Sequence, residues 1–314
     1  MTISTPFTEL VGCRFPIQQA GMGGASTPEL AAAVSNAGGL GMLTATAEDV
    51  RADVSVTLDA TSGRPFGVNF LVPFLDRAVL DDVAPRVRVV EWFWGQPDAV
   101  LVAVAHDAGA LAAWQVGSRD EAVAAVDAGC DFVVAQGVEA GGHVRGTIGL
   151  LPLLDAVLGA VDAPVVAAGG IGTGRAVAAV LAAGASGARI GTRFVATSES
   201  GAHPAYKQAL VSAQASETVL TEAFGVWWPN APHRVLQSAL QAATALVADF
   251  AGTQNSRSIP RFAVTTPNRA TTGRVDAMAL YAGQSIDSVT AILSATDIVN
   301  ELASEAEHHL RRPT

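Results

Sequence analysis

The sequence is poor in cysteine and in charged residues, and each shortage excludes some classes of protein. Its 314 residues include two cysteines, Cys13 and Cys130, in no CxxC or metal-ligand spacing. This predicts no disulfide framework and favours a reducing cytoplasm. Only 15% of the residues are charged, whereas half are hydrophobic, a balance that suits a large buried core and excludes a disordered chain.

Positive charge is the scarcer sign. The chain has 19 Lys and Arg against 29 Asp and Glu, a formal net charge of −10. We expect no nucleic-acid partner, because phosphate contacts need clustered Lys and Arg. Charge-free stretches fall short of the roughly 20 residues of a membrane span, and residues 1–9 have neither the basic nor the apolar region of a signal peptide. The expectation is a cytoplasmic protein without a membrane segment.

A short theme is present in several copies: an Ala/Val-rich segment, a glycine, and then a compact apolar run. Such a copy is typical of a helix that ends at a left-handed glycine and leads directly into a buried strand. The copies are 31–43, 102–114, 122–134 and 176–190, with their glycines at Gly38, Gly109, Gly129 and Gly184. Two of the helices have capping-box spacing at their start, Ser26 with Glu29 and Ser118 with Glu121.

The apolar runs predict eight strands, most without alternation, as in parallel strands buried on both faces. The ranges are 16–20, 40–44, 66–70, 88–93, 110–115, 131–135, 164–168 and 187–191. With helices between them, they favour an α/β fold of the (β/α)8 TIM-barrel type, with an open Rossmann-like sheet as the alternative. We predict a barrel from 1–224 and 276–314 and a small, mainly helical appended subdomain at 225–275, after a further candidate strand at 217–224.

Glycines follow the seventh and eighth predicted strands, where barrels often bind phosphate. Ala168, Gly169 and Gly170 end the seventh strand, and Gly191 with Thr192 ends the eighth. Backbone N–H groups can approach phosphate oxygens closely at such turns. The run GGIGTGR lacks the last glycine of a dinucleotide fingerprint, which favours a mononucleotide such as FMN.

A histidine leaves the sixth predicted strand in the segment AQGVEAGGH (135–143). Gly141 and Gly142 let the backbone lie close to a flat ring, and His143 at this face is a candidate general base or hydrogen-bond donor. Further candidate ring contacts are Met22 after the first predicted strand, Asn69 at the third and Gln136 at the sixth. Asn69 and Gln136 could equally satisfy local backbone groups, and a methionine such as Met22 is in general more often a core residue. The roles of His203 and His233 stay open.

Several of these motifs together resemble the nitronate monooxygenases, once called 2-nitropropane dioxygenases. They are PIQQAGMGG (16–24), GVNF (67–70), AQGVEAGGH (135–143), PVVAAGGIGTGRAVAAVLAAGASGARIGTRFVAT (164–197) and YAGQS (281–285), in family order along nearly the whole chain.

The resemblance implies a noncovalent FMN and assigns residues to it. Gly169, Gly170, Gly191 and Thr192 would hold the phosphate, and His143 matches the family's active-site histidine. Met22, Asn69 and Gln136 would line the flavin, and Tyr281, Gly283, Gln284 and Ser285 would approach it from the C-terminal segment.

Two positions depart from the family pattern. Gly21 stands where many members have proline, and Val144 separates His143 from Arg145-Gly146, whereas some members place Arg-Gly directly after the histidine. The reach of Arg145 therefore stays open. So do the role of Trp227 and Trp228, as pocket cap or subdomain core, and pairing of the chain as a homodimer.

The resemblance implies oxidation of alkyl nitronates, small-molecule substrates, by O2 to a carbonyl compound and nitrite. Where a neutral nitroalkane is accepted, His143 would remove the α-proton, and its protonated form would stabilise the bound anion. One alternative is an NAD(P)H-dependent FMN reductase acting on quinones or, like the flavin-type enoyl-acyl-carrier-protein reductases, on enoyl thioesters. Another is a flavin-binding or sensing protein without turnover.

Overall fold

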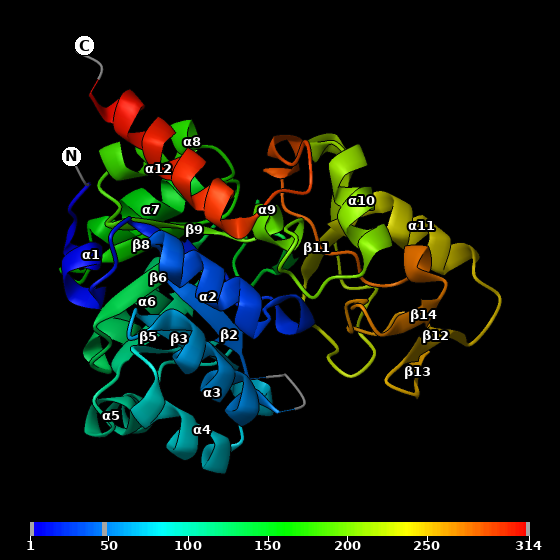
Figure 1. Ribbon diagram of the computed structural model, residues 1–314, viewed down its shortest axis with the longest axis horizontal. Coiled ribbons are helices and arrows are strands. Elements are labelled where there is room, and N and C mark those ends of the chain that lie inside the picture. Colours follow the sequence, from blue (N-terminus) through cyan, green and yellow to red (C-terminus); the bar gives the residue numbers. More distant parts are fainter. Residues whose placement is uncertain (1–2, 46–48, 312–314) are drawn as a thin grey trace.

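Eight parallel strands form a closed barrel in the computed structural model, which describes residues 3–45 and 49–311 (Figure 1). The order around the barrel is β1-β9-β8-β6-β5-β4-β3-β2. A parallel bridge between Gln18 and Leu40 joins the two ends. The barrel strands are β1 (Ile17–Gln19), β2 (Gly41–Thr44), β3 (Phe66–Leu71), β4 (Val89–Phe93), β5 (Leu111–Val116), β6 (Phe132–Gln136), β8 (Val165–Ala168) and β9 (Gly187–Ile190). The eight predicted strands and the closed barrel are confirmed, and the open sheet is excluded.

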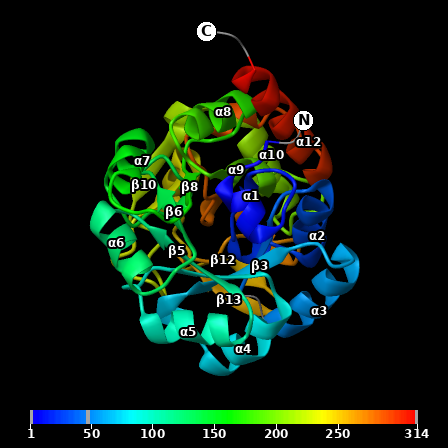
Figure 2. The same cartoon turned by 90° about the vertical axis from the view of Figure 1, so that its left-hand side faces the viewer.

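Helices surround the barrel because each strand is buried on both faces and needs an outer cover. They are α2 (Pro28–Ala37), α3 (Val50–Thr61), α4 (Arg77–Val83), α5 (Ala99–Asp107), α6 (Arg119–Asp127), α7 (Leu150–Leu158), α8 (Gly174–Ala182) and α12 (Ala295–Leu310). The C-terminal helix α12 packs between α8 and α2 and thereby completes the ring (Figures 1 and 2).

The ends of these elements follow local sequence signals, with one exception. Gly38, Gly109, Gly129 and Gly184 all have positive φ, as predicted for glycines that end helices. Ser118 is the N-cap of α6, but the predicted cap Ser26 is wrong, because Thr27 caps α2. Ser26 instead accepts a hydrogen bond from the backbone N–H of Met22 (2.9 Å) and so fixes the loop after β1.

A short helix, α1 (Pro6–Val11), lies at the N-terminal end of the barrel, and Figure 2 shows it within the ring of strands. Its Phe7 is buried among inward-facing side chains and meets Phe132 edge to face, with ring centroids 5.4 Å apart. Because this end is covered, the opposite, C-terminal end is the one at which a ligand site can open.

The part of the chain that follows β9 and precedes α12 forms a second core. Its elements are α9 (Thr192–Val195), α10 (Pro204–Ser212), β10 (Thr218–Thr221), β11 (His233–Leu236), α11 (Gln237–Ala245), β12 (Phe250–Gln254), β13 (Arg257–Pro260) and β14 (Thr271–Gly273). Strand β10 lies inside the candidate range 217–224. The core includes Tyr206, Leu210 and Ile286, which lie outside 225–275, and a separate subdomain at 225–275 stays a proposal.

The segment 225–275 is mixed rather than mainly helical. It holds one α-helix, α11, and the strands β11 to β14. The hairpin between β12 and β13 turns at Asn255 and Ser256, both with positive φ, which is the backbone of a tight two-residue hairpin turn. The strands here are short and polar, so their alternation is weak in the sequence. Within the described residues, no helix is long and apolar enough to cross a membrane.

Candidate active site

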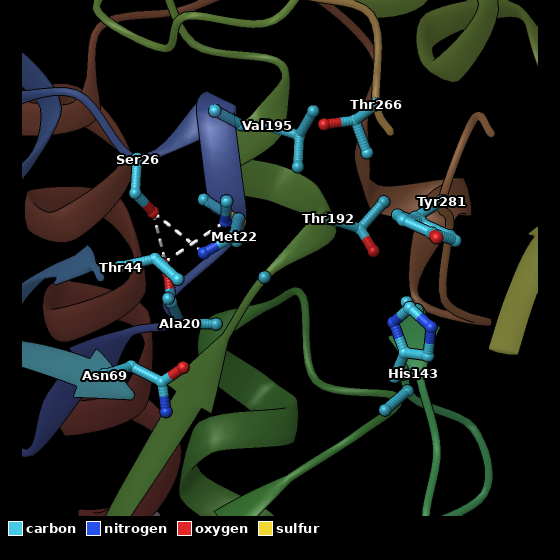
Figure 3. Close-up of a pocket in the computed structure, with 18 of the residues that line it drawn as sticks. Ala20, Met22, Ser26, Thr44, Asn69, His143, Thr192, Val195, Thr266 and Tyr281 are labelled. Atoms are coloured by element: carbon cyan, nitrogen blue, oxygen red, sulfur yellow. Dashed lines mark hydrogen bonds between the residues drawn. The ribbon is translucent and has the colours of Figure 1, made fainter. Parts of the chain in front are cut away.

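A cavity of about 620 Å³ opens at the C-terminal end of the barrel, between the strand ends and the second core. Figure 3 shows Met22, Thr44 and Asn69 on one side of it and Thr192, Tyr281 and His143 on the other. All but one of the predicted site residues line it: Met22, Asn69, Gln136, Gly141, Gly142, His143, Ala168, Gly169, Gly170, Gly191, Thr192, Tyr281, Gly283 and Ser285.

The exception is Gln284, which is exposed and does not line the cavity. Its backbone N–H donates to the carbonyl oxygen of Glu139 (2.9 Å). Next to it, Gly141 and Gly283 meet backbone to backbone: a Cβ on Gly141 would lie 2.5 Å from the nitrogen of Gly283. The C-terminal segment therefore lies directly on the loop that carries His143, and glycine is required at this crossing.

Glycines form one wall of the cavity. Gly169 (φ 108°) and Gly170 (φ 68°) follow β8 in the left-handed region, where side chains with a Cβ are disfavoured. Gly191 follows β9, and the Thr192 hydroxyl accepts a hydrogen bond from the backbone N–H of Gly283 (2.9 Å). This wall lets a ligand group reach the backbone, as a phosphate does.

Two side-chain amides, those of Asn69 and Gln136, line the cavity floor and use their N–H2 groups on protein acceptors. The Asn69 amide donates to the Glu91 carboxylate (2.8 Å), and the Gln136 amide donates to the His143 carbonyl oxygen (3.0 Å). Both partners are pure acceptors, so each amide must turn its N–H2 toward them. Gln136 Oε1 is buried without a hydrogen-bond partner among the described residues. Such a floor fits a ligand that brings N–H or O–H donors, as a flavin ring and its ribityl chain do.

Gly21 allows Asn69 to hold this position. A Cβ at residue 21 would lie 2.8 Å from Cβ of Asn69 and 2.9 Å from the hydroxyl oxygen of Thr44. Any side chain there, proline included, would displace Asn69. Glycine at position 21, where many family members have proline, therefore fits the close packing of the cavity floor.

His143 lies on a two-residue strand, β7 (Gly142–His143), which pairs with β11 in register His143 to His233. Its ring stacks on Trp228, with centroids 4.0 Å apart and planes at 24°. Trp94 and Tyr281 meet the same ring edge-on, with centroids 5.6 and 5.5 Å away. The Nε2 atom is buried without a hydrogen-bond partner among the described residues.

Burial, and to a smaller extent the neighbouring His233, lowers the pKa of His143 to about 3. The ring is therefore neutral at neutral pH, which is the form that can accept a proton. The predicted stabilisation of an anion by protonated His143 is available only after the ring has taken a proton.

His233, left open by the sequence, is fully buried and held as a neutral ring. Its Nδ1 lies 2.8 Å from the carbonyl oxygen of Ala231, to which it donates, and its Nε2 accepts from the backbone N–H of Phe224 (3.2 Å). Burial lowers the pKa of His233 as well. The ring lies 5.3 Å from that of His143, so it belongs to the wall behind the candidate base.

Trp227, Trp228 and Arg145, whose roles the sequence leaves open, differ in whether they line the cavity. Trp228 is 7% exposed and lines the cavity, whereas Trp227 is 56% exposed and does not. Arg145 is outside the cavity lining and donates to the carboxylate of Glu121 (2.5 Å). No group of three or more His, Cys, Asp or Glu is placed to hold a metal ion in the part of the chain that the structure describes.

A sequence model of the nitronate monooxygenase family matches residues 4–83 and 74–305. The chain belongs to the nitronate monooxygenase family. This family consists of flavin-dependent oxidoreductases, so the chain is an enzyme of that class. The predicted family is confirmed.

Three similar proteins show how the chain compares with known proteins. The nitronate monooxygenase of Pseudomonas aeruginosa is 37% identical over 267 residues, 68% of this chain and 76% of that one. The (3aS,4S,5R,7aS)-5-hydroxy-7a-methyl-1-oxo-octahydro-1H-indene-4-carboxyl-CoA dehydrogenase of Rhodococcus jostii is 38% identical over 243 residues, 76% of this chain and 67% of that one. The solved structure of nitroalkane oxidase from Streptomyces ansochromogenes is 35% identical, with a TM-score of 0.78 over 97% of this chain and 99% of that one.

Proposed function

We propose that the chain binds FMN in this cavity and oxidises small alkyl nitronates with O2 to a carbonyl compound and nitrite. The observation that carries the proposal is His143, a neutral ring that lines a cavity with a glycine wall and two amide side chains on its floor, and whose buried Nε2 has no hydrogen-bond partner among the described residues. The family match and the nitroalkane oxidase structure support oxidation of nitro compounds.

The donor and acceptor groups of the cavity match the parts of FMN. Gly169, Gly170, Gly191 and Thr192 would hold the phosphate, and Asn69 and Gln136 would accept hydrogen bonds from the ring or its ribityl chain. Met22, Gly141, Gly142, Ala168, Tyr281, Gly283 and Ser285 would complete the contact surface. FMN would supply the electron-accepting ring that the protein side chains lack.

His143 would act on the carbon next to the nitro group. A nitronate is already an anion and needs no base, whereas a neutral nitroalkane must first lose its α-proton, which Nε2 of the neutral ring would accept. Trp228 and Trp94 cover the ring and keep water from it. The charge that forms on His143 would then face the new nitronate anion and stabilise it.

A second candidate is oxidation of a hydroxylated ring carried by coenzyme A. The 38% identity to the Rhodococcus jostii dehydrogenase favours it. This second candidate depends on the name of a relative, and the proposed cytoplasmic location depends on composition. Neither depends on a feature of the cavity.

One set of assays separates these readings. Purified protein would be supplied with ethyl nitronate, nitroethane, a hydroxyacyl-CoA with an artificial acceptor, or NAD(P)H with a quinone. We expect oxygen uptake and equimolar nitrite and aldehyde from ethyl nitronate. His143→Asn should retain FMN and turnover of ethyl nitronate but lose most activity on nitroethane. Turnover of the hydroxyacyl-CoA or the quinone without nitrite formation would replace the proposal.

A further inference from the structure

A layer of buried polar side chains crosses the barrel at the floor of the cavity, which three of them, Asn69, Gln115 and Arg189, line. Its members come from five strands: Gln18, Asn69, Glu91, Gln115 and Arg189. Glu91 is at its centre and is fully buried. One carboxylate oxygen accepts from Asn69 (2.8 Å), and the other accepts from Gln18 (3.2 Å) and Arg189.

Arg189 uses its guanidinium entirely within this layer. Besides Glu91, it donates to the side-chain oxygens of Gln18 (3.2 Å) and Gln115. Burial lowers the pKa of Arg189 to about 9, so it remains charged at neutral pH and balances the Glu91 carboxylate. A buried ion pair is rarely the most stable filling for a core, because apolar side chains avoid its desolvation cost. Its place under the cavity indicates a positional role.

That role follows from the chemistry of Asn69. An amide can present either its oxygen or its N–H2, and the two are close to equal in shape. A carboxylate can only accept, so Glu91 binds the N–H2 and leaves Oδ1 for the cavity. If residue 91 were an amide, it could accept or donate, and Asn69 could turn its N–H2 toward the ligand.

We propose that Glu91 is a positioning residue for the cofactor: it holds the Asn69 amide so that an acceptor, and not a donor, faces the flavin. This rests on the proposed binding of FMN. A flavin ring carries an N–H donor and gains another on reduction, so Oδ1 favours bound flavin and affects its reduction potential. Glu91 itself does not line the cavity and acts through Asn69.

The test uses FMN-loaded protein and three variants: Glu91→Gln, Asn69→Ala, and both together. The rate of FMN release on dilution, followed by flavin fluorescence, and the reduction potential are measured for each. Loss of one well-placed hydrogen bond corresponds to a rise in FMN release of about tenfold. We expect about that rise and a changed potential for Glu91→Gln, and no additional effect of Glu91→Gln when residue 69 is alanine.

Glu91→Gln leaves Arg189 without its carboxylate, so a second variant guards against misfolding. Glu91→Gln with Arg189→Met removes both charges. Because Arg189 also lines the cavity, Arg189→Met alone is measured beside it, and the double variant should release FMN about tenfold faster than that single variant. Val133→Ala, buried in the outer layer of β6 away from the cavity, controls for lost stability and should leave release and potential unchanged. FMN release at the wild-type rate in Glu91→Gln, or an equal effect in the Asn69→Ala background, overturns the positioning role. Wild-type protein that binds no FMN overturns the proposed function instead.

Discussion

Replacing Trp228 by alanine should raise the pKa of His143. The pKa falls from 6.5 to about 3 chiefly because the ring is buried, and Trp228 covers one ring face at a centroid distance of 4.0 Å. Trp94 and Tyr281 would remain in Trp228→Ala, so only part of the burial is relieved. We expect the pKa to rise by about one to two units, and each unit corresponds to about 1.4 kcal/mol.

The assay is the pH dependence of kcat/KM for nitroethane, whose α-proton the neutral histidine must take. Activity falls as pH falls through the pKa of the base. The wild-type profile should be flat from pH 8 down to the acid limit of the protein's stability, and Trp228→Ala should lose activity at about one to two pH units above the wild-type pKa. Trp227→Ala is the matched control, because Trp227 is exposed and outside the cavity. The reasoning is refuted if Trp228→Ala keeps the wild-type profile or if both variants shift alike.

Three further predictions concern other parts of the site. Gly283→Ala places a Cβ 2.7 Å from the nitrogen of Gly141 and should lower both Tm and FMN content. The control Gly159→Ala, whose Cβ has its nearest contact at 3.5 Å, should lower neither. Equal melting curves for the two variants would contradict the close crossing. Arg145→Ala should change kcat/KM for ethyl nitronate by less than about twofold, as expected for a side chain away from the chemistry, and a larger loss would place Arg145 at the substrate. The folded-state pKa of His143 lies below its unfolded value of 6.5, so the unfolded chain binds the proton more readily and the free energy of unfolding should fall as pH drops from about 6.5 toward 3. Denaturant titrations of His143→Asn should show a weaker fall over that range, and an unchanged slope would exclude this histidine as its source.

The barrel could be predicted from the sequence because its signals are local. Most strands are apolar runs, and four of the preceding helices end at a glycine with positive φ. The glycines after β8 and β9 and the histidine after β6 occur where the C-terminal ends of parallel strands meet. Strand order alone therefore brought Gly170, Gly191 and His143 to one cavity.

What the sequence could not predict depends on contacts between distant residues. The pair Glu91 and Arg189 is separated by 98 positions, and Glu91 lies in none of the motifs. Trp227 and Trp228 are neighbours in the sequence. Trp227 has a positive φ and is exposed at the surface, whereas Trp228 is buried at the cavity. Gln284 is part of the family motif. Its backbone N–H donates to Glu139, and its side chain lies outside the cavity.

The central claim is that the cofactor in this cavity takes electrons from an alkyl nitronate. It is tested most directly by mixing FMN-loaded protein with ethyl nitronate, and separately with NADPH and NADH, in the absence of oxygen while the visible flavin absorbance is recorded. The account predicts rapid loss of the oxidised flavin absorbance with ethyl nitronate and none with either nicotinamide. Rapid bleaching by a nicotinamide, with no response to ethyl nitronate, would contradict it and identify a reductase.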